Sequence, residues 1–177
     1  AILLESFWQM NGFKEEGSNL YLAFYAYVVV GVSEELSKYF FVQRIMRRPY
    51  VDEPYDGILY SVMVSLGFAF VENVMYVFEY GVGTGITRAF TAVPAHATFA
   101  AVMGFYLSKA KFTGNYAFNT LLGLGGAIVL HGSYDYFLFI KNVPLIQIGA
   151  LVSLAIGVKL TRIAIRIHNE NSPFRTE

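Results

Sequence analysis

The sequence predicts an all-α membrane protein, a multi-pass helical bundle with about five transmembrane helices. Hydrophobic residues make up 55% of the 177-residue chain and charged residues only 15%. The mean hydropathy is +0.47, which is too apolar for an ordinary soluble domain. About five windows are each long enough to cross the hydrocarbon core. Because the loops between them are short, we expect residues 1–177 to form a single membrane-embedded domain.

Each element follows from its own stretch of sequence. Residues 1–17 are too short to span a bilayer and lack the basic region of a signal peptide, so we expect an interfacial helix or the remnant of an upstream span. Residues 168–177 are polar, and we expect a cytoplasmic tail in which His168 is solvated. The predicted spans are residues 20–42, 57–80, 89–110, 117–140 and 144–167.

The first predicted span contains three charged residues, Glu34, Glu35 and Lys38, in an otherwise apolar run. Near the middle of a transmembrane helix each charge costs about 2.5 to 3.5 kcal/mol, so such residues are normally kept where they face polar partners inside the bundle. Lys38 lies one turn after both glutamates and could simply form salt bridges with them. This span alone leaves a functional and a structural interpretation open.

Three further spans carry polar side chains. The second contains Glu72 and Asn73, the third contains His96, and the fourth contains His131 and Asp135. The last two are four residues apart and therefore share one helix face. Taken singly, these residues could be structural hydrogen-bonding groups or a buried core histidine.

Together, these residues indicate an interior site. Three glutamates, two histidines and an aspartate in four apolar helices are an expensive way to hold a bundle that small residues can hold alone. Two histidines plus carboxylates are also the ligand types of a hydrolytic zinc centre, in which three protein ligands leave a position for water. The sequence has no HExxH motif, so this inference depends on residue types.

The charge pattern predicts an orientation. Basic residues gather in the loop after the first span, in the loop after the third, and in the tail, whereas the opposite flanks are weakly basic. The positive-inside rule then places the first loop and the C-terminus in the cytoplasm. The sequence has no cysteine, which excludes disulfides, thiolate ligands and a cysteine nucleophile. A net charge of zero gives no indication of a nucleic-acid partner, and we expect none.

The polar blocks resemble the PrsW family of intramembrane proteases. The blocks are EELSK at 34–38, FAFVE at 68–72, HATFAAVMG at 96–104 and HGSYD at 131–135, one per helix and in this order. The segment DEPYDGILY at 52–60 is similar to the start of the family's second helix. The related CPBP-type proteases typically carry EExxxR and FxxxH; Lys38 and Glu72 stand in those places here, so the sequence is closer to PrsW.

The resemblance implies proteolysis within a prokaryotic plasma membrane. Its substrate would be a single-pass membrane protein, with site-one cleavage of an anti-sigma factor as the known type of role. Family members usually have more helical chain before the EExxK helix than precedes Glu34 here.

We expect a divalent metal, with zinc favoured by the ligand types, and Glu35 as the base that activates water. Glu34 and Lys38 would position and charge-balance Glu35, because a protonated lysine keeps at least one of the two glutamates ionised. A metal-free mechanism, in which glutamates activate water and histidines stabilise the oxyanion, is also open. The expected metal ligands are His96 and His131 together with Asp135 or Glu72.

Helix geometry raises one question about this scheme. At 1.5 Å per residue, Glu72 and the two histidines lie about 4 to 6 Å to the extracytoplasmic side of their helix midpoints, whereas Glu35 lies about 5 to 6 Å to the cytoplasmic side of its own. The first helix must therefore tilt, start deeper, or be interrupted near Gly31 or Ser33.

Two other classes of function fit the same residues. A small proton- or ion-coupled transporter could use buried Glu, Asp and His side chains as a relay, although the sequence has no inverted repeat. A catalytically inactive membrane scaffold would lose stability, but no activity, when these residues are mutated.

Overall fold

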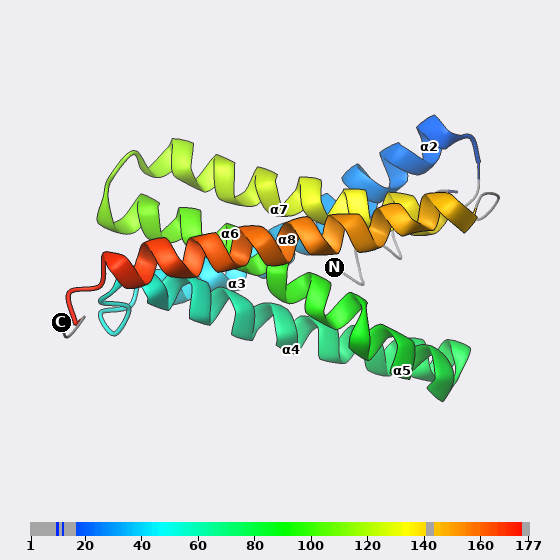
Figure 1. Ribbon diagram of the computed structural model, residues 1–177, viewed down its shortest axis with the longest axis horizontal. Helices are drawn as coiled ribbons and strands as arrows, with labels where there is room; N and C mark the ends of the chain where they lie inside the picture. Colours follow the sequence, from blue (N-terminus) through cyan, green and yellow to red (C-terminus); the bar gives the residue numbers. More distant parts are fainter. Residues whose placement is uncertain (1–9, 11, 13–16, 141–143, 175–177) are drawn as a thin grey trace.

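The computed structural model describes residues 10, 12, 17–140 and 144–174, and over these residues the chain is helical without strands (Figure 1). The elements in order are α2 (Asn19–Phe24), η1 (Tyr25–Val32), α3 (Ser33–Met46), α4 (Pro54–Tyr80), α5 (Val82–Phe90), α6 (Ala92–Phe112), α7 (Tyr116–Phe139) and α8 (Pro144–Glu170). The first three form one continuous rod, as the first predicted span requires. The prediction of an all-α membrane bundle is confirmed.

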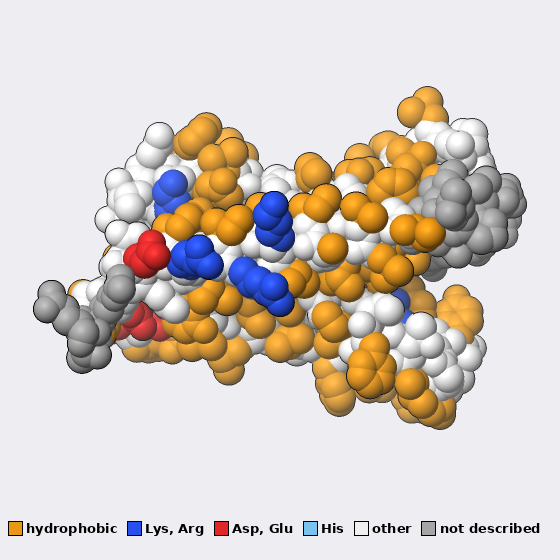
Figure 2. Space-filling view, in the orientation of Figure 1, with side chains coloured by type: hydrophobic (Ala, Val, Ile, Leu, Met, Phe, Trp, Pro, Cys, Tyr) orange, Lys and Arg blue, Asp and Glu red, His pale blue; other side chains and the backbone are white. Residues whose placement is uncertain are grey.

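Four segments of the described chain are long and apolar enough to cross a membrane: Asn19–Met46, Pro54–Tyr80, Val82–Phe112 and Ile148–Glu170. The remaining predicted span corresponds to α7, which has 24 residues but does not meet the same apolar criterion. Its polar residues, including Asn119, His131 and Asp135, lower its hydropathy. Hydrophobic side chains are spread over the whole length of the face seen in Figure 2, and lysines and arginines gather over the C-terminal half of α8.

Helix α6 lies at the centre and packs against α4, α7 and α8. Small residues let α4 and α6 approach closely, because a Cβ on Gly104 would lie only 2.3 Å from the carbonyl oxygen of Gly57. The Ser108 hydroxyl donates to the carbonyl of Pro54 at 2.6 Å, and the Ser65 hydroxyl donates to that of His96 at 2.9 Å. These contacts fix the register between the helices that carry Glu72 and His96.

The first membrane helix, formed by α2, η1 and α3, is interrupted near Gly31 and Ser33, one of the three ways in which Glu35 was expected to reach the level of the histidines. Residues Tyr25–Val32 form a π-helix, which ends directly before Ser33. Because its hydrogen bonds run from i to i+5, a π-helix holds more residues per turn than an α-helix and changes the phase of the residues that follow. It is held against α7, where a Cβ on Gly132 would lie 2.5 Å from the Tyr27 ring and the Tyr27 hydroxyl hydrogen-bonds Ser133 at 2.7 Å.

Two regions differ from the prediction. The segment predicted as a loop before residue 89 contains helix α5, separated from α6 by Thr91. The prediction that His168 is solvated is wrong: its side chain is 3% exposed, and its ring stacks on that of Phe105 at 4.5 Å, because α8 stays packed against α6 to its end. Most of the interfacial helix expected in residues 1–17 lies outside the described residues.

Candidate active site

The residues predicted from sequence meet in one buried cluster at the junction of α3, α4, α6 and α7. Each contacts at least one other member of the cluster through a hydrogen bond or ion pair. Residues separated by almost a hundred positions are thus brought within hydrogen-bond distance. The members are Glu34, Glu35, Lys38, Glu72, His96, His131 and Asp135.

Lys38 lies at the centre of the cluster and is only 1% exposed. Its ammonium donates to Glu35 Oε1 at 2.7 Å and to Glu34 Oε2 at 3.3 Å. It also lies 2.8 Å from His96 Nδ1 and 4.7 Å from the centre of the Phe68 ring. A buried ammonium needs this number of acceptors to offset the loss of its hydration.

His96 is held from both sides of its ring. Because the Lys38 ammonium can only donate, Nδ1 is the acceptor, and Nε2 then carries the proton and donates to Glu72 Oε2 at 3.1 Å. Glu72 in turn forms an ion pair of 2.7 Å with Arg88. The arrangement fixes both the tautomer and the orientation of His96.

His131 has a carboxylate at each ring nitrogen. Nδ1 lies 2.8 Å from Glu35 Oε1, and Nε2 lies 3.1 Å from Asp135 Oδ2, one turn further along α7. Its ring stacks on Phe99 with a centroid distance of 5.3 Å and an interplanar angle of 24°. These contacts leave the imidazole little freedom to rotate.

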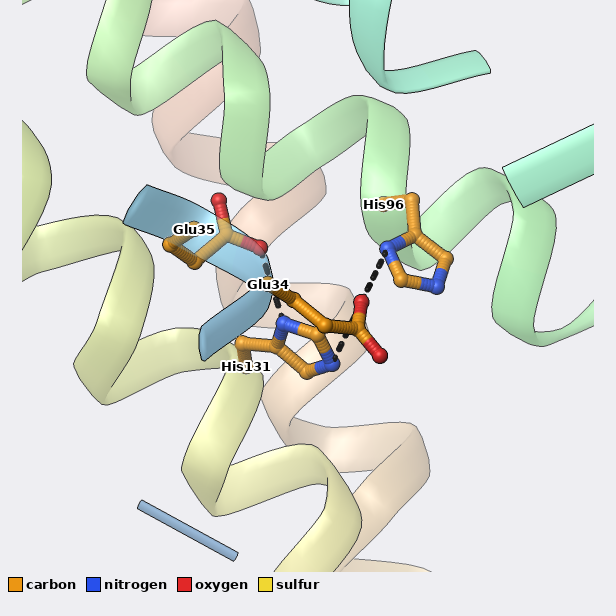
Figure 3. A group of neighbouring side chains, drawn as sticks. All are labelled: Glu34, Glu35, His96 and His131. Carbon is orange, nitrogen blue, oxygen red and sulfur yellow. Dashed lines mark hydrogen bonds and ion pairs between the residues drawn. The ribbon is translucent and has the colours of Figure 1, made fainter. Parts of the chain in front are cut away.

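The two adjacent glutamates point in different directions, as Figure 3 shows. The Glu34 carboxylate lies between the two histidines, with Oε2 3.9 Å from His96 Nδ1 and 3.8 Å from His131 Nε2. Glu35 turns toward the other nitrogen of His131 and is 0% exposed. Neighbouring residues on a helix point about 100° apart, so the two carboxylates approach His131 from different sides.

A cavity of about 250 Å³ borders the cluster. Glu34 lines it, whereas Glu35 and Lys38 are not among its lining residues. Its wall also contains aromatic side chains from η1, α4 and α7, such as Tyr25, Tyr76 and Phe139. The other cluster residues in its wall are Glu72, His96, His131 and Asp135.

The donor set fits a divalent metal in chemistry and in charge. Glu34, Glu35, His96 and His131 each offer a ligand atom, and these atoms lie within 4.8 Å of one another. Glu35 Oε2 is buried and has no hydrogen-bond partner among the described residues. Nitrogen and carboxylate oxygen donors of this kind suit zinc.

The net charge of the cluster also suits a divalent metal ion. Four carboxylates face the cations Lys38 and Arg88, so with neutral histidines two negative charges remain unbalanced. A divalent cation would balance both, and a second proton on His131, which has a carboxylate at each ring nitrogen, would offset one of them. Lys38 already contacts several of the same donors, so a metal bound among them would compete with its ammonium.

The predicted ligands Glu72 and Asp135 lie outside that group of four. Each contacts a histidine nitrogen, Glu72 at His96 and Asp135 at His131. Carboxylates in this position commonly orient ligand histidines and raise their basicity. Their assignment as direct ligands stays a prediction.

Arg88 is a residue of the site that reasoning from the sequence missed. It lies on α5, lines the cavity, and places its guanidinium 3.7 Å above the centre of the Tyr76 ring. Its only sequence signal is that it is an arginine on the weakly basic flank of the bundle. That signal is equally typical of a residue at the membrane surface.

Residues 1–160 match the family described as PrsW family intramembrane metalloprotease. Protease PrsW of Clostridioides difficile is 37% identical over 152 residues, which cover 79% of this chain and 61% of the relative. Protease PrsW of Geobacillus kaustophilus is 42% identical over 122 residues, which cover 66% of this chain and 53% of the relative. Protease PrsW of Bacillus subtilis is 40% identical over 118 residues, which cover 65% of this chain and 54% of the relative.

The chain spans only between 53% and 61% of the length of these three relatives. No solved structure matches it. The family match nevertheless extends over most of the chain and includes every residue of the buried cluster. The chain therefore belongs to the PrsW family of intramembrane metalloproteases.

Proposed function

We propose that this protein is an intramembrane peptidase that hydrolyses a peptide bond of a membrane-anchored protein in the cavity beside Glu34. The observation that carries the proposal is the buried group of Glu34, His96 and His131 in the wall of that cavity. A carboxylate next to two fixed imidazoles supplies a proton acceptor and oxyanion stabilisers, which are the groups that peptide hydrolysis by water needs. Membership of the PrsW family supports the same reaction class.

In this mechanism Glu34 accepts a proton from a water molecule in the cavity. The water oxygen attacks the peptide carbonyl carbon, and the carbonyl electrons move to oxygen to give a tetrahedral oxyanion. An N–H of a cavity histidine donates a hydrogen bond to that oxyanion. As the C–N bond breaks, the proton held by Glu34 passes to the leaving amine.

The cavity wall favours Glu34 over Glu35 as the proton acceptor. Glu35 is the residue that the sequence suggested, but it lies behind the wall and contacts Lys38 and His131 Nδ1. In this position it orients His131 and offsets the charge of Lys38. We therefore assign Glu35 a positioning role.

A divalent metal, with zinc favoured by the donors, would be held by His96, His131 and the neighbouring carboxylates, and would act as a Lewis acid on the scissile carbonyl and the water. His96 would use Nδ1, since Nε2 donates to Glu72. In the metal-free alternative, N–H groups of the histidines would stabilise the oxyanion themselves.

We further propose that the cut lies toward the extracytoplasmic side of the membrane. The cavity is lined by residues from the C-terminal halves of α4 and α7 and the start of α6. The clusters of lysine and arginine lie toward the opposite ends of these helices and of α8. By the positive-inside rule those basic ends are cytoplasmic. The substrate class we propose is a single-pass membrane protein such as an anti-sigma factor, which is what the resemblance to the PrsW family implies.

The interior beyond Lys38 is mostly apolar, and this argues against the transporter alternative. Toward the basic end of the bundle, the core is built from Val42, Met46, Met103 and Leu107, each less than 9% exposed. A proton or ion relay would need polar groups through this region. The described residues thus form a polar pocket reached from one end.

Cleavage by protein reconstituted in liposomes tests the proposal. The probe is a synthetic peptide with one transmembrane helix and its extracytoplasmic flank. Glu34→Gln and His131→Ala should each lower kcat by about 10²- to 10⁴-fold, whereas Glu170→Gln, an exposed glutamate at the end of α8, should not. Normal cleavage by Glu34→Gln would contradict its role.

Two further measurements separate the alternatives. Ion flux across the same liposomes distinguishes a peptidase from a transporter, which would conduct ions and leave the peptide intact. Metal content of the purified protein, followed together with activity before and after chelation, decides between the metal-dependent and metal-free mechanisms. Parallel loss of metal and activity supports the former, and full activity without metal supports the latter.

A further inference from the structure

We infer that Arg88 is a positioning residue of the active site, which fixes His96 by holding Glu72, and that α5 exists to carry it there. The inference rests on the proposed peptidase function. It concerns a residue outside the four polar blocks that the sequence resemblance identified.

Helix α5 is fixed to α4 by contacts that need a glycine. A Cβ on Gly85 would lie 2.2 Å from Val77 Cγ2, so α5 can approach α4 this closely only because Gly85 has no side chain. The Asn73 amide donates to the Gly85 carbonyl at 3.1 Å, from the residue that follows Glu72. The docking of α5 is thus built on the same turn of α4 as the carboxylate that contacts His96.

The two faces of α5 differ in character. Val82, Ile86 and Phe90 are spaced four residues apart and are 66%, 57% and 78% exposed, so one face is suited to lipid. Arg88 is two positions from Ile86 and therefore lies on the opposite side of the helix. Its guanidinium packs on the Tyr76 ring, and the Arg88 side chain as a whole is 17% exposed.

The contacts of Arg88 continue to the centre of the cluster. Arg88 lies 2.7 Å from Glu72 Oε2, and the same oxygen accepts from His96 Nε2 at 3.1 Å. Nδ1 of the same ring faces Lys38 and Glu34. Among the described residues, Arg88 is the lysine or arginine within salt-bridge distance of Glu72. Without Arg88, this half-buried carboxylate would lose its counter-charge and the contact that aims it at His96.

The test combines kinetics with an activity-independent signal. The chain has three histidines, so ring-¹⁵N histidine labelling gives a simple spectrum in which His168, far along α8, is an internal control. Arg88→Gln and Glu72→Gln should shift the His96 signals in the same way and leave those of His168 unchanged. Arg88→Lys should restore most of the wild-type His96 signal.

In cleavage assays, Arg88→Gln should lower kcat about 10- to 100-fold with little change in KM, as for other residues that orient an active-site histidine. The double variant with Glu72→Gln should be no worse than the poorer single variant, because both act through one contact. Arg44→Gln is the matched control, since Arg44 also stacks on an aromatic ring but lies outside the cluster.

The outcomes are distinct from those of the proposed function. If the wild type cleaves no peptide, the peptidase proposal fails, and the histidine spectra alone decide the role of Arg88. The inference is overturned if Arg88→Gln leaves the His96 signals unchanged. It is also overturned if the decrease in kcat caused by Arg88→Gln adds fully to the decrease caused by Glu72→Gln.

Discussion

Replacing Lys38 with methionine is the perturbation that best probes the electrostatic balance of the cluster. Methionine keeps a straight side chain of similar length, which can still pack against Phe68, but it removes the ammonium. That ammonium lies 2.7 Å from Glu35, 3.3 Å from Glu34 and 2.8 Å from His96. The change therefore leaves two buried carboxylates without their nearest cation.

The expected loss of stability in Lys38→Met follows from these contacts. Removing one partner of a buried ion pair costs about 3 to 5 kcal/mol, mostly because the other charge stays buried and unpaired. Lys38→Met should lower the free energy of unfolding by about that amount. In Lys38→Met/Glu35→Gln a buried charge of each sign is gone, so the double variant should recover at least about 1 kcal/mol relative to the sum of the two single effects.

Reversible unfolding in mixed detergent micelles measures these differences. Lys159→Met, at an exposed position of α8, is the matched control and should change the unfolding free energy by less than about 0.5 kcal/mol. A Lys38→Met protein as stable as this control would refute the reasoning. The reasoning would also be refuted if the unfolding free energy of Lys38→Met/Glu35→Gln changed by the sum of the two single effects.

Three other outcomes follow from the structure. Gly132→Ala should lower the melting temperature, since its Cβ would overlap Tyr27 and such overpacking costs about 1 to 3 kcal/mol, whereas Gly125→Ala, whose Cβ has open space around it, should not. Lys111→Met should speed amide exchange in the turn between α3 and α4, because the ammonium donates to three backbone carbonyls there; unchanged exchange would contradict this. If a metal binds among the cluster donors, calorimetry should find tighter zinc binding by Lys38→Met than by the wild type, since the competing ammonium is gone; weaker binding would argue against shared donors.

The helices were largely predictable because apolar windows of spanning length leave little choice of structure in a bilayer. The predicted span 57–80 corresponds to α4 at Pro54–Tyr80, with a start set by Pro54 and by Asp56, which accepts from the backbone of Glu53. Helix α5 was missed because its nine residues are too few to give a spanning signal and contain two glycines. Its position depends on the tertiary contact between Gly85 and Val77.

The residues that meet in the buried cluster were predictable, but their arrangement within it was not. Burial costs single out charged residues in apolar helices, which is why all the predicted side chains lie in the cluster. Whether Glu34 or Glu35 faces the cavity depends on the phase of α3, and this is set by the π-helix that precedes it. A sequence pattern based on α-helical periodicity carries no information about that change of phase.

The central claim is that Glu34 exchanges a proton with water in the cavity, and a single-turnover cleavage rate tests it most directly. With enzyme in excess over the transmembrane peptide, Glu34→Gln should bind the peptide normally and cleave it about 10²- to 10⁴-fold more slowly than the wild type. Glu35→Gln, which disturbs the orientation of His131 and the charge balance at Lys38 but leaves the proton acceptor in place, should lose about 10- to 100-fold. A Glu34→Gln protein that cleaves faster than Glu35→Gln would contradict the account.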